Sequence, residues 1–169
     1  MTRTLILTRH AKSAWDDPTL DDFDRTLNGR GRKSAKAIGN WLVQMGVLPD
    51  LVLVSGARRT VETWSRMAPA FPPTATMQSV PALYHGSADT ILNVLKTQSS
   101  ATVMLIAHNP GIAEFAERVL STPVAHPKFH QYPTGATTLM SFDTDVWSEV
   151  SWGSGTAQDF TVPRDLLES

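Results

Sequence analysis

The sequence predicts an α/β fold, a three-layer sandwich with a mostly parallel central sheet, helices on both faces and an antiparallel edge. Three short apolar runs, at residues 5–7, 51–54 and 103–106, are rich in Val, Leu and Ile and lack polar alternation. A strand that is buried on both faces of a parallel sheet reads in this way. Helical patterns lie between the runs, and an alternation of strands and helices is typical of this architecture.

Length and composition indicate a single soluble domain over residues 1–169. A chain of this length buries roughly 70% of the surface that its unfolded form exposes, so it needs no disulfide to stay folded. It has no cysteine, which excludes a disulfide scaffold, a thiolate metal site and a cysteine nucleophile. Without a signal peptide or a membrane-length apolar segment, the chain is expected in the cytoplasm with no membrane partner. With 15 basic and 16 acidic residues, no nucleic-acid partner is expected.

Four helices are predicted between and after the strands. Three of them begin at a residue that suits the N-cap, namely Asn28, Ser87 and Asn109. The remaining helix spans residues near 57–68 and ends at a group of prolines. In each helix, apolar residues recur at spacings of three and four, so one face packs against the sheet.

The remaining segments are a polar loop and three further strands. The loop at 13–26 carries five aspartates. A short strand is expected near 79–83. At the end of the chain, residues 137–142 and 146–152 look like two strands joined by a turn at 143–145. This hairpin indicates the antiparallel edge of the sheet.

Cationic and imidazole side chains follow three of the predicted strands. Arg9 and His10 follow the first, Arg59 comes soon after the second, and His108 follows the strand that begins at 103. The carboxyl ends of parallel strands share one edge of the sheet, where ligands bind, so these side chains are expected to meet. Two guanidiniums suit a phosphoryl group, and a neutral imidazole between them can attack phosphorus. A single histidine after a strand is more often structural, but three such strand ends together predict a phosphate site.

Six short motifs run through the chain in a fixed order. They lie at residues 9–13, 27–31, 55–63, 106–111, 132–136 and 163–166. The first, Arg-His-Ala-Lys-Ser, resembles the signature of the histidine phosphatase (phosphoglycerate mutase-like) superfamily, in which Arg-His-Gly is usual. The next two match the following blocks of that superfamily, and the last three are similar to its SixA-type phosphohistidine phosphatases. The resemblance covers essentially the whole chain and implies a phosphoglycerate mutase-like fold.

The resemblance implies a role for each residue at the strand ends. His10 becomes transiently phosphorylated, Arg9 and Arg59 bind the phosphoryl oxygens, and His108 stabilises the same group. Arg58 is then a neighbour and not a ligand. No cofactor and no metal are expected, because the two arginines would repel a cation beside the histidines.

The chain departs from the superfamily pattern at the proton donor. Mutases and many ester phosphatases of the superfamily place a Glu after the strand near residue 80, where this chain has Tyr84 and His85. His85 is therefore either a candidate proton donor or an exposed loop histidine. The imidazole of a phosphohistidine leaves more easily than an alkoxide, so the missing Glu favours a phosphoramidate substrate.

The stretch between Arg59 and His108 is short, which leaves little room for the lid insertion of mutase-like relatives. We expect an open pocket with the loops at 16–24 and 123–133 as its rim. A carboxylate would repel phosphate, so Asp16 is expected to turn away or to contact a basic side chain. An open site suits a phosphohistidine on the surface of another protein, such as a histidine phosphotransfer domain.

The sequence therefore predicts a metal-independent phosphohistidine phosphatase that works through an intermediate on His10. Two alternatives remain. The first is a broader phosphatase for small phosphate esters, which His85 as a proton donor would favour. The second is a non-catalytic module that binds phosphorylated proteins, against which the intact His10 weighs.

Overall fold

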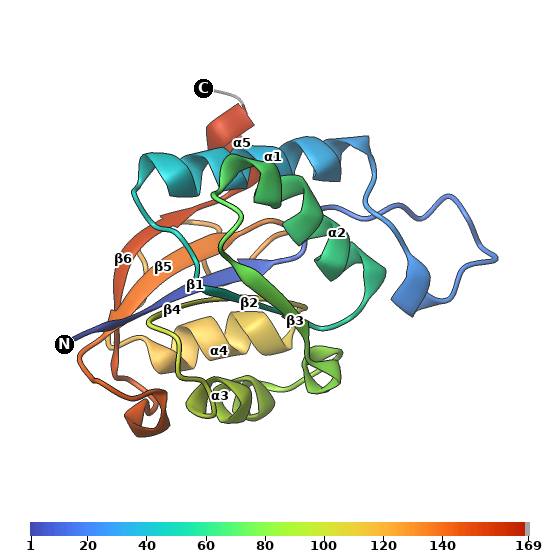
Figure 1. The fold of residues 1–169 in the computed structure, drawn as a ribbon. Coiled ribbons are helices and arrows are strands. Elements are labelled where there is room, and N and C mark those ends of the chain that lie inside the picture. The colour runs from blue at the N-terminus through green and yellow to red at the C-terminus, as the bar shows by residue number, and fades with distance from the viewer. Residues whose placement is uncertain (168–169) are drawn as a thin grey trace.

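A single six-stranded sheet forms the centre of the computed structural model, which describes residues 1–167 (Figure 1). The strands are β1 Arg3–Arg9, β2 Leu51–Val54, β3 Thr76–Ser79, β4 Thr102–Ala107, β5 Thr137–Phe142 and β6 Gly155–Thr161. Their spatial order is β3-β2-β4-β1-β5-β6. Strands β3, β2, β4 and β1 are parallel, whereas β5 and β6 are antiparallel to their neighbours. The predicted mostly parallel sheet with an antiparallel edge is confirmed.

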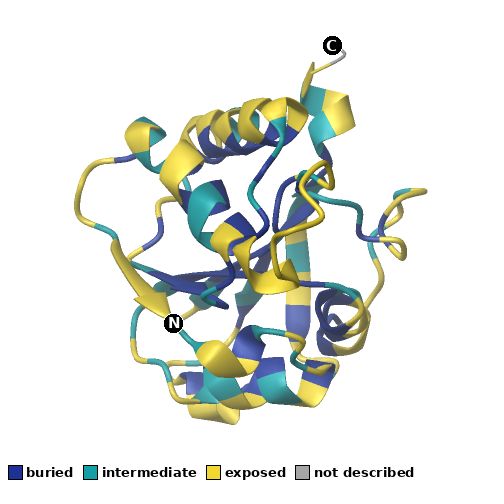
Figure 2. Ribbon diagram, turned by 90° about the vertical axis from the view of Figure 1, so that its right-hand side faces the viewer, coloured by how far each residue is buried: buried dark blue, intermediate teal, exposed yellow. Residues whose placement is uncertain are grey.

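Helices cover both faces of the sheet (Figure 1). They are α1 Gly29–Gln44, α2 Arg58–Met67, α3 Ala88–Lys96, α4 Gly111–Val119 and α5 Pro163–Leu167. Helices α1, α2 and α5 lie on one face, and α3 and α4 lie on the other. Alternate residues of a strand point to opposite faces, so β1 sends Leu5 and Leu7 into one core and Ile6 into the other. Figure 2 shows buried residues where the helices meet the sheet and exposed residues on their outer faces. Within residues 1–167, no helix is long and apolar enough to cross a membrane.

Two of the strand predictions are wrong in position. The segment predicted at 79–83 begins where β3 ends, and Pro81–Leu83 forms a 3-10 turn, because proline has no N–H for the sheet. The hairpin predicted at 137–152 is wrong in its second strand. Trp147 is buried in a 3-10 turn, where its indole N–H donates to the carbonyl of Ser100 (2.7 Å), and β6 pairs with β5 in its place.

Two of the three predicted helix caps are confirmed. The side chains of Asn28 and Ser87 accept hydrogen bonds from N–H groups three residues on, at 2.8 and 3.2 Å. The third prediction is wrong, because α4 begins two residues after Asn109. The Asn109 amide instead donates to the carbonyls of Gln131 (3.0 Å) and Tyr132 (3.1 Å). Contacts with the loop before β5 thus replace the capping bond.

The turn after β1 is held from three sides. A Cβ atom on Gly31 would lie 2.0 Å from the carbonyl oxygen of Lys12, so only glycine lets α1 pack directly on this turn. From α2, the Thr63 hydroxyl accepts from the N–H of Ala11 (3.0 Å). From the loop before β5, the N–H of Gly135 donates to the carbonyl of His10 (3.0 Å). Three of the motif segments therefore fix the backbone that presents His10.

Candidate active site

The structure brings together the four side chains that follow the predicted strands. Arg9 ends β1 and His10 follows it, Arg59 lies in the first turn of α2, and His108 follows β4. All four line one cavity of about 320 Å³ at the carboxyl edge of the parallel strands, and His85 lines it as well. The ring centroids of His10 and His108 lie 5.1 Å apart. The cavity is the candidate active site.

His10 is a neutral imidazole with one defined tautomer. Its Nδ1 lies 2.8 Å from the carbonyl oxygen of Ala11, and His10 is 5% exposed. A carbonyl oxygen can only accept, so Nδ1 carries the proton and Nε2 keeps its lone pair. Burial, followed by the charges of His108, Arg9 and Arg59, lowers the pKa of His10 to about 3. At neutral pH the site therefore offers an unprotonated nitrogen.

Polar atoms without partners gather beside this imidazole. Within residues 1–167, Arg9 Nε, Arg59 Nε and His108 Nδ1 are buried and have no hydrogen-bond partner. Leaving a buried donor or acceptor unpaired costs about 1–3 kcal/mol, so unpaired groups that cluster in a cavity indicate a ligand that satisfies them. Two guanidinium N–H groups fit the oxygens of a tetrahedral anion.

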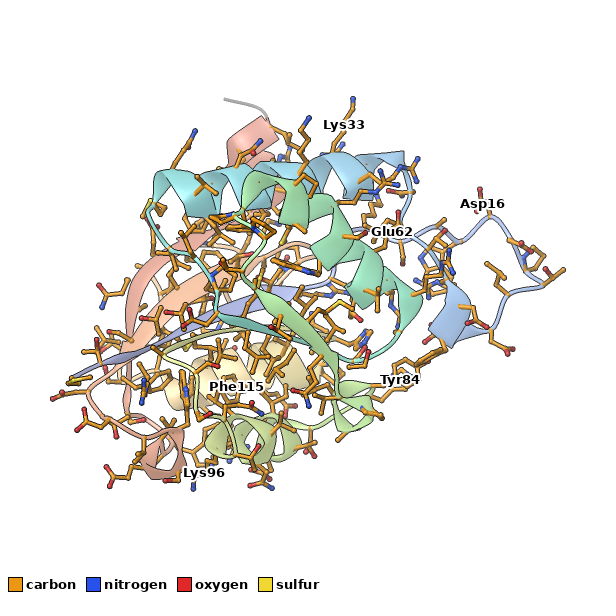
Figure 3. The ribbon with its side chains drawn as sticks, viewed as in Figure 1. Asp16, Lys33, Glu62, Tyr84, Lys96 and Phe115 are labelled. Atoms are coloured by element: carbon orange, nitrogen blue, oxygen red, sulfur yellow. The ribbon has the colours of Figure 1, made fainter. Side chains whose placement is uncertain are left out.

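Asp22 orients Arg59 from the acidic loop. Arg59 Nη1 donates to the Asp22 carbonyl (2.7 Å) and Nη2 donates to Oδ2 (3.0 Å). Both bonds use the ends of the guanidinium, so the edge that carries Nε–H stays available for a ligand. The Tyr84 hydroxyl donates to the same Oδ2, and Figure 3 shows Tyr84 directed toward this loop. Burial alone would raise the pKa of Asp22, but the bonds from Tyr84 and Arg59 lower it to about 2. Asp22 is therefore ionised and cannot serve as a proton donor at neutral pH.

Arg25 also lines the cavity, although it was not predicted as a site residue. Its side chain is buried, with Nη1 on Asp22 Oδ1 (2.9 Å) and Nη2 on the Ser13 hydroxyl. Its guanidinium carbon lies 3.3 Å from the centre of the Trp15 ring. One signal could have identified this residue, because Arg25 is the only basic residue in a loop with five aspartates. A lone cation in such a loop is expected to organise the carboxylates around it.

A chain of hydrogen bonds from α2 holds His108. The Thr60 hydroxyl donates to the carbonyl of Ala57 (2.7 Å), so Ser55 donates its own hydroxyl proton to Thr60 (3.1 Å). Ser55 Oγ then accepts from His108 Nε2 at 2.7 Å. Burial and the positive charge of Arg59 lower the pKa of His108 to about 3, so the ring is neutral and its Nδ1 is unprotonated. A bound dianion would favour a proton on Nδ1, which could then donate to it.

His85 lines the cavity, but its contacts do not establish it as the proton donor in place of the missing Glu. Its side chain is 64% exposed, and its Nε2 is 3.7 Å from Asp22 Oδ2. The backbone of His85 has φ = +56°, in the left-handed region that residues other than glycine rarely adopt. No carboxylate belongs to the described residues that line the cavity. The role of His85 as a proton donor stays a prediction.

The rim of the cavity differs from the expectation. None of the residues of the predicted rim at 16–24 lines the cavity; Trp15 and Arg25, on either side of that segment, line it instead. Asp16 points away from the rest of the molecule (Figure 3). None of the described residues of the predicted rim at 123–133 lines the cavity. Asn109 and Thr134 line it in their place. In the part of the chain that the structure describes, no three His, Asp or Glu side chains are grouped so that they could hold a metal ion.

The two buried histidines predict a loss of stability in acid. The pKa of His10 and of His108 is about 3 in the folded protein, against 6.5 for a free histidine side chain, so the unfolded chain binds more protons between these values. The contribution of these two histidines to the free energy of unfolding is therefore fully present above pH 6.5. It is lost as the pH drops toward 3, by about 1.4 kcal/mol per pH unit for each histidine. Urea unfolding at a series of pH values measures this slope. His10→Gln should make the slope shallower, whereas an unchanged slope in this variant would contradict the assignment.

Comparisons with known proteins agree with this arrangement. Residues 5–84 match the model of the histidine phosphatase superfamily, branch 1. Residues 5–84 of the chain are thus similar to the histidine phosphatase superfamily. An uncharacterised chloroplastic protein of Arabidopsis thaliana is 35% identical over 127 residues, which are 69% of this chain. The chain spans 58% of the length of that plant relative.

Solved structures of similar proteins extend the likeness to nearly the whole chain. A structure from Nakamurella multipartitia, described as a candidate phosphohistidine phosphatase SixA, is 23% identical with a TM-score of 0.82, and the match covers 96% of this chain and 97% of that one. A second candidate SixA protein, from Agrobacterium tumefaciens, is 26% identical with a TM-score of 0.77, over 95% of this chain and 98% of that one. The chain therefore has the phosphoglycerate mutase-like fold that the sequence motifs imply.

Proposed function

We propose that this protein is a histidine phosphatase and that it hydrolyses phosphohistidine on another protein through a covalent phosphohistidine at His10. One observation carries the proposal. The unprotonated Nε2 of His10 belongs to a buried ring in a cavity that Arg9 and Arg59 also line, and the Nε–H of each arginine has no partner among the described residues. A nucleophile beside donors for phosphoryl oxygens is what phosphoryl transfer requires.

In the first step of the proposed mechanism, the Nε2 lone pair of His10 attacks phosphorus and the P–N bond of the substrate breaks. Arg9 and Arg59 donate to the equatorial oxygens and offset the charge that collects there. The imidazole of the substrate takes a proton from solvent on its other ring nitrogen before the bond breaks, so that it leaves as a neutral ring. In the second step, water attacks the phosphorus on His10, and the new P–N bond breaks to release inorganic phosphate. The mechanism uses no metal and no cofactor, because the two guanidiniums supply the positive charge.

No carboxylate belongs to the described residues that line the cavity, which supports a phosphoramidate as the substrate. An alkoxide leaving group needs a proton during the reaction, and the ionised Asp22 cannot provide one. The imidazole of phosphohistidine, with a conjugate-acid pKa of about 6.5, departs without such help. The similarity to candidate SixA proteins supports the same substrate class. The proposed partner is a protein that carries phosphohistidine, such as a histidine phosphotransfer domain.

Hydrolysis of small phosphate esters is the second candidate function. It is favoured by His85, whose exposed ring lines the cavity and could donate a proton to an ester oxygen. His85 would then matter for esters and not for phosphohistidine.

The dependence of the rate on the leaving group tests the proposal. A phosphohistidine peptide and an aryl phosphate should react at least about 10²-fold faster than glycerol phosphate in the presence of EDTA, since a general acid contributes 10²- to 10⁴-fold where one is needed. His85→Ala should slow cleavage of the peptide less than about twofold, as should the control His130→Ala, which does not line the cavity. If glycerol phosphate reacts as fast as the peptide and His85→Ala impairs only the esters, the broader phosphatase replaces this proposal.

A further inference from the structure

A second cavity, of about 250 Å³, adjoins the candidate active site. Lys12 and Thr134 line both cavities, so the two share a wall. Four cationic side chains line the second cavity, which are Lys12, Arg30, Lys128 and Arg164. They come from four separate segments of the chain, namely the turn after β1, the start of α1, the loop before β5, and α5. The fold thus collects positive charge at one place beside the phosphoryl site.

No carboxylate belongs to the described residues that line the second cavity, so the charges of Lys12, Arg30 and Lys128 are collected there without one. The whole chain has a formal net charge of −1, so the local excess is not a consequence of its composition. Cations that are held close together repel one another, and an anion bound among them removes that cost.

The position of the second cavity indicates which anion it binds. Lys12, Arg30 and Lys128 are exposed, so the surface of another protein can reach them. A monophosphate that fills the first cavity has no second charged group to place in the adjoining one. A protein that presents a phosphohistidine can place an acidic side chain there from the same surface.

We propose that the second cavity binds an aspartate or glutamate side chain of the protein substrate while its phosphohistidine occupies the cavity lined by His10. This inference rests on the proposed function and gives it a specificity element. Lysine and arginine donors hold a carboxylate through charge-assisted hydrogen bonds, and exposed charges of this kind raise the rate of association. The enzyme therefore selects phosphohistidines with acidic neighbours.

A pair of peptides tests the selection. Both carry phosphohistidine, one flanked by glutamates and the other by glutamines. The wild-type enzyme should cleave the glutamate peptide with a kcat/KM about 10-fold higher, and added salt should reduce the difference. The double variant Arg30→Glu/Lys128→Glu should lose or reverse this preference. Its turnover of p-nitrophenyl phosphate should stay unchanged, because neither position lines the cavity that contains His10.

A matched control separates the local site from the overall charge. Lys36→Glu/Lys96→Glu changes the net charge by the same amount, and neither position lines the second cavity. Lys96 lies at the end of the molecule opposite α1, the helix that carries Arg30 and the labelled Lys33 (Figure 3). This control should keep the preference for the glutamate peptide. If both double variants lose the preference equally, long-range attraction explains it and the second anion site is wrong.

The remaining outcomes distinguish this inference from the proposed function. Cleavage of both peptides at equal rates contradicts the second anion site and leaves the phosphohistidine phosphatase intact. Failure to cleave either peptide, with p-nitrophenyl phosphate still hydrolysed, overturns the proposed function and the inference with it. If the Arg30→Glu/Lys128→Glu variant loses only activity on propane-1,3-diol bisphosphate, the second cavity binds the distal phosphate of a small molecule, and the protein substrate is wrong.

Discussion

Replacing His10 with alanine is expected to reduce turnover of a phosphohistidine peptide by at least about 10⁴-fold, because the change removes the nucleophile of the proposed mechanism. The fold should survive. The side chain of His10 makes one hydrogen bond, to Ala11, and the backbone N–H that bonds to Ala107 (3.2 Å) is retained in the variant. Steady-state kinetics measure the loss, and thermal unfolding monitors the fold.

His130→Ala is the matched control for this experiment, because His130 is exposed and does not line the cavity. It should retain the wild-type rate. A folded His10→Ala variant that keeps more than about 1% of the wild-type rate would show that another residue attacks phosphorus.

The second large effect separates two adjacent arginines. Arg59→Ala should lower kcat/KM by about 10²-fold or more, since it removes a charge-assisted donor from the transition state. Arg59 is 4% exposed and lines the candidate active site, and its Nε–H has no partner among the described residues. Arg58 is exposed and lines a different cavity, so Arg58→Ala should change the rate less than about twofold.

Binding of inorganic phosphate, measured by calorimetry, provides a readout of the same pair without catalysis. Arg59→Ala should weaken it, and Arg58→Ala should not. A larger effect of Arg58→Ala would mean that Arg58, and not Arg59, binds the phosphate.

The sequence predicted the central part of this site because local signals and topology agree there. Each apolar run is long enough to identify a buried strand, and parallel strands bring their carboxyl ends to one edge. Knowing only that Arg9 and His108 follow such strands is enough to place them side by side. The helix caps at Asn28 and Ser87 were equally accessible, because a cap depends on residues within one turn.

The sequence did not predict the part of the site that depends on contacts between distant segments. Asp22 lies in a polar loop with no regular pattern, and only the fold brings it to Arg59 and Tyr84. The same limit explains why the second strand of the predicted hairpin was wrong. Trp147 fits a strand by its composition, but burial of its ring in the core requires a turn there, and the less apolar segment that forms β6 pairs at the edge instead.

Trapping of the phosphorylated enzyme tests the central claim most directly. The wild-type protein is mixed with a phosphohistidine peptide labelled with ³²P, denatured within the first turnover and digested for mass spectrometry. We expect label at His10 that is stable in base and labile in acid, and no label in the His10→Ala variant. Label at another residue, or complete hydrolysis in single-turnover conditions with no labelled protein at any time point, would contradict a covalent intermediate on His10.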